Sequence, residues 1–218
     1  MIVASATLET DIFEKYFEGL NYSKIELEAP IHDVEEIYSD NPNPDMNIAE
    51  SCVDHLKKIF EHIKANFNEN NPKKPNILVF LPSIPAIKEA KLLIECDYDK
   101  FFVTLQKDIQ YNIEELHGGL TPDEKSVVIA PQGHDQGYVR VILATKIAET
   151  AITLENIRYV LDSGYERNYY FDEIARLDYM EEQLISESSR LQRKGRAGRV
   201  SDGFMFKMYT EEKEKEMA

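Results

Sequence analysis

The sequence predicts an α/β fold, in which a mostly parallel sheet is covered by helices. Short apolar runs rich in β-branched residues alternate with segments of helical periodicity, as in sheets of this kind. Two of the runs, residues 77–81 and 157–161, are almost wholly apolar, which is typical of central parallel strands buried on both faces. The chain has 218 residues, enough for one full domain or for one domain and a fragment.

Each expected element has its own local signal. Residues 48–67 place apolar side chains at helical spacing with lysines on the opposite face, so they predict a helix. Residues 121–129 begin with a threonine cap, a proline and two acids, which is typical of a helix start. Apolar patterns predict the remaining elements, which are strands at 77–81, 138–144, 157–161 and 204–209 and a helix at 84–94. Residues 101–105 fit either a strand or the end of a helix.

The first 25 residues differ from the rest of the chain. Residues 2–4 predict a strand and residues 8–17 predict a helix. Elements this short cannot bury their apolar faces alone. We therefore interpret residues 1–25 as the last piece of a preceding domain.

Composition and charge exclude several classes of protein. The chain carries 25 Lys and Arg against 40 Asp and Glu, a net charge of −15, so any contact with nucleic acid has to be local. The two cysteines, Cys52 and Cys96, form no CxxC pair, which argues against a zinc module or a disulfide scaffold, and no metal site is predicted. No apolar run approaches the roughly 18 residues of a membrane span. We expect a soluble protein of a reducing, intracellular compartment, with no membrane partner.

The strongest local signal is the octet Gln-Arg-Lys-Gly-Arg-Ala-Gly-Arg at residues 192–199. On one helix, Gln192, Arg196 and Arg199 would share a face, and two guanidiniums with an amide suit a phosphoryl group. The two glycines are poor helix formers, so we expect them to allow close approach to another backbone or a ligand. Residues 186–199 carry five positive charges and one negative charge. The alternative is a solvated basic helix or a general nucleic-acid patch.

A second signal is Thr145, which directly follows the strand predicted at 138–144. If a helix begins there, its free N–H groups and its dipole favour an anion. The alternative is a threonine that only caps the helix.

In their order along the chain, these segments resemble the motifs of the DEAH-type superfamily 2 RNA helicases. The match covers essentially the whole chain and consists of Ser5-Ala-Thr-Leu-Glu9 (motif III), residues 29–38 (the start of the second RecA-like domain), 77–83 (motif IV), 116–120, 145–153 with 159–164 (motif V), 192–199 (motif VI) and 209–212. The residues of motifs IV and VI are similar to those of the NPH-II-like helicases of large DNA viruses.

The resemblance implies a RecA-like three-layer fold in three parts. Residues 1–25 would be the tail of the first RecA-like domain, 26–210 the second RecA-like domain, and 211–218 the start of a connection to a winged-helix region. The sequence contains no GxxxxGK[ST] phosphate loop and no Asp-Glu-x-His, which belong to the first domain in this family. That domain, as a partner in cis, would bind most of the ATP or other NTP with Mg²⁺. This chain alone would not hydrolyse NTP.

For the nucleotide, the resemblance implies that Arg196 and Arg199 act as arginine fingers on the γ-phosphate. Gln192 would orient the phosphate or the attacking water. The other residues expected at the nucleotide are Glu155, Ile129 and Thr153. Many family members carry, in place of Ile129, a Phe that stacks on the base, so we expect weak discrimination among NTPs.

Other positions also depart from the family pattern. Ala151 stands for a common Ser, Glu155 for an Asp, and Lys146 for an Asn. Ser5 and Thr7, near the hinge between domains, would couple the active site of the first domain to the motion of the second.

For RNA, the resemblance implies contacts from Ser83, His117, Gly118 and Thr145. Hydroxyls and backbone N–H groups bind phosphates without reading bases, so binding would be independent of sequence. The expected partner is single-stranded RNA or a duplex with an overhang. Without the family match, His117 would be interpreted as an ordinary histidine. Arg167, among tyrosines, fits either a loop that touches the strand or an exposed β-hairpin.

The predicted function is therefore the second RecA-like domain of an NTP-dependent RNA helicase, monomeric as a fragment. One alternative is a non-catalytic nucleic-acid-binding or scaffold protein derived from a helicase. Another is a DNA translocase of the same superfamily. The resemblance implies a location in the cytoplasm or nucleus, or in the virion if the protein is viral.

Overall fold

The computed structural model describes residues 14–21, 23, 25, 32–40, 46–66, 74–96, 100–105, 107–130, 137–149, 152–199 and 201–217. The chain forms two compact units, Met1–Ile31 and His32–Ala218. In the first unit, residues 14–16 are helical. The motif III residues Ser5 and Thr7 lie outside the described residues, so their predicted role in domain coupling stays a prediction.

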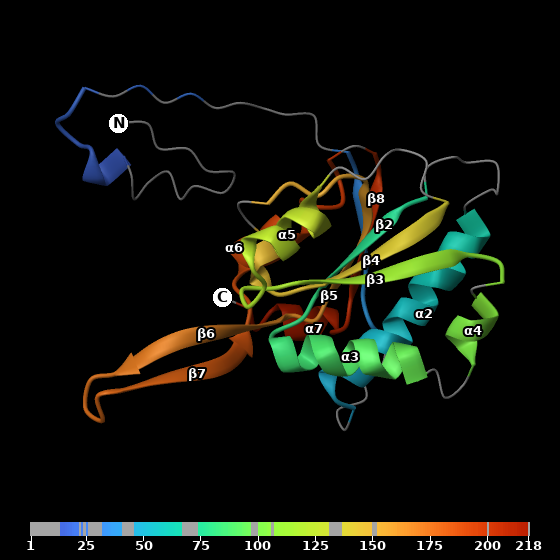
Figure 1. The fold of residues 1–218 in the computed structure, drawn as a ribbon. Helices are drawn as coiled ribbons and strands as arrows, with labels where there is room; N and C mark the ends of the chain where they lie inside the picture. Colours follow the sequence, from blue (N-terminus) through green and yellow to red (C-terminus); the bar gives the residue numbers. More distant parts are fainter. Residues whose placement is uncertain are drawn as a thin grey trace. The chain divides into compact units, whose positions relative to one another are not determined.

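The second unit is built on a six-stranded sheet with the strand order β1-β8-β5-β2-β4-β3 (Figure 1). Its strands are β1 (Val34–Ile37), β2 (Asn76–Phe80), β3 (Gln110–Leu116), β4 (Tyr138–Ala144), β5 (Ile157–Asp162) and β8 (Gly203–Lys207). Every neighbouring pair in this order is parallel. All five residues of β2 are buried, as predicted for a central parallel strand.

Helices cover both faces of the sheet. The helices are α2 (Ile48–Asn66), α3 (Ile84–Cys96), α4 (Phe101–Leu105), α5 (Pro122–Ile129), α6 (Glu187–Lys194) and α7 (Glu211–Glu214). Figure 1 shows α2, α3 and α4 on one face and α5 and α6 on the other. Alternate residues of β2 serve the two faces: Ile77 and Val79 join the apolar cluster under α2, whereas Leu78 and Phe80 join the opposite cluster. The predicted three-layer α/β fold is confirmed.

The elements with strong local signals form where the sequence predicts them. Helix α2 ends one residue before the predicted bound, and β4 matches its predicted range. Helix α5 begins with a complete capping box: Thr121 Oγ1 accepts the N–H of Glu124 at 3.3 Å, and Glu124 Oε2 accepts the N–H of Thr121 at 2.7 Å. The described residues include no helix long and apolar enough to cross a bilayer.

One strand bound differs from the sequence-based expectation, and two ambiguous segments are assigned by the structure. The last strand ends at Lys207, two residues before the predicted bound at 209. The ambiguous residues 101–105 form the short helix α4. Beyond β5, the segment that contains Arg167 forms an antiparallel hairpin of β6 (Tyr165–Asp172) and β7 (Leu177–Leu184), which projects from the sheet in Figure 1. The hairpin interpretation is therefore confirmed.

The turn between β5 and the hairpin depends on Gly164. Its φ is +77°, a conformation that residues with a side chain rarely adopt. A Cβ on Gly164 would lie 2.7 Å from the Tyr209 ring, whose hydroxyl donates a hydrogen bond to Asp162 at 3.0 Å. A side chain at this position would thus strain the backbone and push on a buried polar network.

We predict that Gly164→Ala lowers the free energy of unfolding of the 218-residue chain by roughly 1–3 kcal/mol, because it combines left-handed strain with this steric clash. Chemical denaturation followed by circular dichroism measures the change. Gly118→Ala is the matched control for stability, since no described atom lies within 4 Å of the added Cβ and Gly118 is not among the described glycines with positive φ. Equal stability of the two variants would contradict the prediction.

Candidate functional site

The loops that follow three neighbouring strands lie at the carboxyl-terminal edge of the sheet. Ser83 follows β2, His117 and Gly118 follow β3, and Thr145 follows β4. Backbone hydrogen bonds hold these loops together: the Thr145 N–H donates to the Leu116 carbonyl at 3.1 Å. The four residues predicted to touch RNA are therefore brought to one edge, where ligands commonly bind in open parallel sheets.

The local structure at Thr145 differs from the expectation. The chain forms only a three-residue 3-10 helix, η1 (Lys146–Ala148), and the Thr145 side chain makes no capping hydrogen bond to it. A helix therefore begins after Thr145 as expected, but only as a short 3-10 turn, and the alternative that the hydroxyl serves as a cap is wrong. Ser83, in contrast, caps α3, since its Oγ accepts the N–H of Ala86 at 3.4 Å.

His117 is buried with one ring nitrogen unsatisfied. Its Nε2 lies 3.6 Å from Glu115 Oε2, whereas Nδ1 has no hydrogen-bond partner among the described residues. A buried polar atom without a partner costs free energy unless water or a ligand satisfies it. The neighbouring Gly118 is exposed. An exposed backbone at Gly118 thus lies next to a buried, unsatisfied ring nitrogen at this edge of the sheet.

Helix α6 carries the start of the basic octet and ends inside it. Ser186 caps the helix, because its Oγ accepts the N–H of Ser189 at 3.2 Å. After Lys194 the chain continues with tighter i→i−3 bonds, from the Arg196 N–H to the Arg193 carbonyl at 3.1 Å. The predicted single helix through residue 199 is therefore wrong, because the poor helix former at position 195 ends it.

The end of α6 changes how the octet is displayed. A 3-10 turn has about 3.0 residues per turn instead of 3.6, so Gln192 and the two later arginines do not form one helical stripe. Gln192 is half-buried and its Nε2 lies 3.5 Å from Ser188 Oγ, one turn earlier. A Cβ on Gly195 would meet only ordinary contacts, at 3.4 Å or more, so close backbone approach does not require glycine there.

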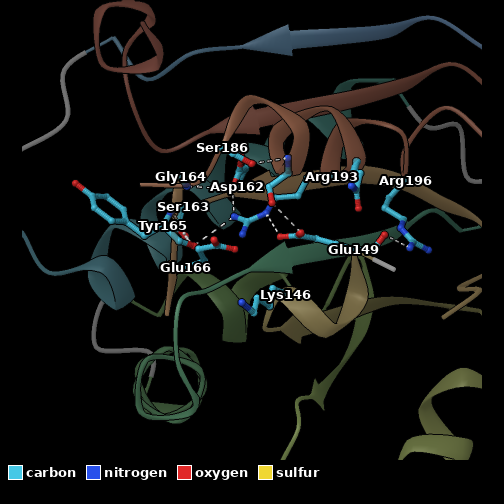
Figure 2. A network of polar contacts seen from close by, with 12 residues as sticks. Lys146, Glu149, Asp162, Ser163, Gly164, Tyr165, Glu166, Ser186, Arg193 and Arg196 are labelled. Atoms are coloured by element: carbon cyan, nitrogen blue, oxygen red, sulfur yellow. Dashed lines mark hydrogen bonds and ion pairs between the residues drawn. The ribbon is translucent and has the colours of Figure 1, made fainter. Parts of the chain in front are cut away.

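Arg193, which the sequence analysis did not single out, is the centre of a buried ionic network (Figure 2). Its side chain is 1% exposed, with Nε 2.7 Å from Glu149 Oε1 and Nη1 2.6 Å from Asp162 Oδ1. The guanidinium also lies 4.8 Å from the centre of the Phe80 ring. The network ties α6 to the end of β5 and to the loop after β4.

Burial shifts the pKa values of both Arg193 and Glu149. Burial alone would lower the pKa of Arg193, but Asp162 and Glu149 outweigh it and raise the pKa. Burial raises the pKa of Glu149, although Arg193 opposes the shift. The sequence held one signal for this network: Asp162 ends an apolar central strand, where a carboxylate needs a partner.

Arg196 is also buried, at 5% exposure, but its surroundings are different. Its guanidinium donates hydrogen bonds to the backbone carbonyls of Ile152 and Glu149, and no described carboxylate forms an ion pair with it. Burial and then the charge of exposed Arg199 lower the pKa of Arg196 to about 10. The charge of the Glu149 carboxylate opposes this shift without forming an ion pair. The two guanidiniums therefore keep a positive charge that no described carboxylate pairs with, which favours an anion.

The residues predicted at the nucleotide lie away from the RNA edge. Glu155 lies two residues before β5, and its carbonyl accepts a hydrogen bond from Asn76 Nδ2 at 2.8 Å. Ile129 ends α5 and packs against the apolar cluster of Leu78 and Phe80. Both lie toward the amino-terminal ends of the strands. Thr153 is exposed, in the segment that connects η1 to β5.

We predict that Arg193→Met destabilises the 218-residue chain by about 3–5 kcal/mol, because it leaves two buried carboxylates without a cation. Arg167→Met is the matched control: its ion pair with Glu182 is partly exposed, with side chains 37% and 34% accessible, so we expect a loss of only about 0.2–1 kcal/mol. Denaturant titration measures both. A small loss in Arg193→Met, equal to the control, would show that the network does not anchor α6.

Comparisons with known proteins identify the family of the chain. The model of the helicase conserved C-terminal domain matches residues 54–201. The ATP-dependent RNA helicase HrpA of Borreliella burgdorferi is 32% identical over 97% of this chain and 23% of its own length. A putative ATP-dependent RNA helicase, L540, of Acanthamoeba polyphaga mimivirus is 25% identical over 97% of this chain and 28% of its own length.

A solved structure gives the same result. The crystal structure of the Escherichia coli DEAH/RHA helicase HrpB superposes with a TM-score of 0.75 at 25% identity, over 98% of this chain and 24% of that one. The chain spans about a quarter of the length of these relatives. It belongs to the helicase conserved C-terminal domain family, and it is the C-terminal RecA-like domain of a DEAH/DExH-type superfamily 2 helicase.

Proposed function

We propose that this domain supplies arginine fingers to NTP hydrolysis in an RNA helicase and forms half of a clamp on single-stranded RNA. One observation carries the proposal: Arg196 is buried beside Arg199 without a carboxylate partner among the described residues. Such a pair attracts the negative charge that develops on a transferred phosphoryl group.

The contrast with Arg193 supports this reading. Arg193 is neutralised by two carboxylates and has a structural role. Arg196 donates to two carbonyls, and a guanidinium has five N–H donors, so others stay available for an anion. A protein that only binds nucleic acid does not need an un-neutralised arginine held in place by backbone carbonyls. This argues against the non-catalytic alternative.

The nucleotide itself would be bound mainly by a first RecA-like domain. Among the described residues, no group of three or more His, Cys, Asp or Glu side chains could hold a metal ion. We therefore assign Mg²⁺ and most contacts to ATP or another NTP to that domain, as the resemblance implies. The 218-residue chain alone is then inactive, and closure of the two domains brings Arg196 and Arg199 to the phosphates.

On this chain, the side chain nearest to the base would be Ile129. It packs into the apolar cluster beneath α5 and has no aromatic face. Base stacking on an aromatic ring is worth about 1–3 kcal/mol, so its loss removes a source of preference. We propose that all four NTPs serve, with Thr153 and Glu155 near the ribose and phosphates.

The carboxyl-terminal edge would bind RNA phosphates. Ser83, His117, Gly118 and Thr145 lie there on neighbouring loops, and the Thr145 hydroxyl is not used as a cap. The relatives reported above are named RNA helicases, which supports RNA over the DNA translocase alternative. The buried, unsatisfied Nδ1 of His117 is suited to a bound water, which could bridge the ring to a phosphate.

We predict that Arg199→Ala, in the protein that joins this domain to its first RecA-like domain, lowers RNA-stimulated NTP hydrolysis by about a hundredfold or more. Affinity for single-stranded RNA should change little, because Arg199 is assigned to the nucleotide. Steady-state hydrolysis and fluorescence anisotropy with labelled RNA measure the two effects.

Lys215→Ala is the control for this test. It removes one exposed positive charge directly after α7, where no nucleotide contact is assigned. Turnover close to that of the unmodified protein in Arg199→Ala would remove Arg199 from the finger role. An equal loss in Lys215→Ala would show that general charge, and not position, is responsible.

A further inference from the structure

An ionic cluster joins α6 to three other elements of the domain. It consists of Glu36 on β1, Arg190 and Lys194 on α6, Lys207 on β8 and Glu214 on α7. We call it the Glu36 cluster. The sequence analysis did not assign a role to any of these five residues.

Glu36 is the residue that contacts most of the cluster. Its Oε1 lies 2.5 Å from Lys194 Nζ, and its Oε2 lies 3.4 Å from Arg190 Nη1. Oε2 also forms an ion pair with Lys207 Nζ. Glu214 contacts two of the same cations, with Oε1 3.4 Å from Arg190 Nη1 and Oε2 paired with Lys207.

The cluster is shielded enough from water for its contacts to matter. The Lys207 side chain is 0% exposed and that of Glu36 is 21% exposed. Burial would raise the pKa of Glu36, but the hydrogen bonds from Lys194 and Lys207 outweigh it and lower the pKa. Glu36 is therefore ionised at neutral pH, and its charge-assisted bonds are of the strong kind.

The cluster and the Arg193 network hold the same face of α6 against two different strands. Positions 190, 193 and 194 share one face of α6, because they are three and four residues apart. Arg193 ties this face to the end of β5, and Lys194 ties it to β1. Two anchors fix the position of the last turn of α6 and its rotation, and Arg196 follows Lys194 by two residues.

We propose that Glu36 is a positioning residue for Arg196 and Arg199, acting through Lys194 and Arg190. The proposal rests on the proposed function, since it gives the arginine pair a task in hydrolysis. Glu36 itself does not touch the nucleotide. Its contribution is to hold the end of α6 in the orientation from which the guanidiniums meet the phosphates when the domains close.

The test uses Glu36→Gln in the protein that carries both RecA-like domains. We expect kcat for RNA-stimulated NTP hydrolysis to fall by roughly tenfold, with KM for NTP and affinity for RNA unchanged, because positioning is lost only where the transition state is stabilised. Glu35→Gln is the matched control: Glu35 is the neighbouring acid on β1 and is exposed. We expect it to behave as the unmodified protein does.

A second variant guards against misfolding of the first. Lys194 is partly exposed, so Lys194→Met removes the same contact from the α6 side without leaving a buried cation unpaired. We expect Lys194→Met to lower kcat to a similar extent, and the double variant Glu36→Gln/Lys194→Met to be no slower than the slower single variant. A thermal melt of each variant confirms that it is folded.

The Arg199→Ala background separates positioning from general stability. If Glu36 acts through the arginine pair, Glu36→Gln lowers the residual rate by less in Arg199→Ala than in the unmodified protein. An equal loss in both backgrounds, or no difference between Glu36→Gln and Glu35→Gln, would overturn the positioning role and leave the arginine role intact. Near-normal turnover of Arg199→Ala itself would overturn both.

Discussion

The structure depends on the burial of Arg193 between Asp162 and Glu149. The guanidinium is almost fully enclosed, and each carboxylate comes from a different part of the sheet: the end of β5 and the loop after β4. A buried charge without a partner destabilises a protein by several kcal/mol, so the fold requires contact among these three residues. Their meeting fixes α6 over the sheet. It also brings the backbone carbonyl of Glu149 to the place where Arg196 binds it.

Three arginines of one short segment consequently have three environments. Arg193 is buried and neutralised, Arg196 is buried and not neutralised, and Arg199 is exposed. In a chain with a net charge of −15, this is an unusual place to leave positive charge without a partner. The arrangement makes physical sense if an anion from another domain completes it. The first arginine then serves the fold, and the other two serve the chemistry.

The sequence predicts what local signals encode. The capping box of α5 and the apolar run of β2 are determined by neighbouring residues in the sequence, and both elements form as expected. The edge strands β1 and β3 were missed because each contains two consecutive glutamates that interrupt the apolar pattern, and the partners of Glu36 and Glu114 are distant in sequence. Glu36 and Lys194 are 158 residues apart, so no local pattern could reveal their contact.

The candidate site shows the same division between local and distant information. Ser83 and Thr145 follow strands that the sequence predicts, whereas His117 follows β3, which it does not predict, and the tertiary fold brings these loops to one edge of the sheet. The expected helical stripe of Gln192, Arg196 and Arg199 does not form, because α6 ends at Lys194, next to the poor helix former Gly195. The structural role of Arg193 depends on Asp162, 31 residues away, and only the tertiary fold shows which arginine is neutralised.

The most direct test of the central claim is a structure of the two-domain protein bound to RNA and to a nucleotide complex that mimics the transferred phosphoryl group. We predict that the guanidiniums of Arg196 and Arg199 lie within about 3 Å of the phosphoryl mimic, while Arg193 keeps its ion pairs with Asp162 and Glu149. A closed complex in which both guanidiniums point away from the mimic, or in which Arg193 replaces them there, would contradict it.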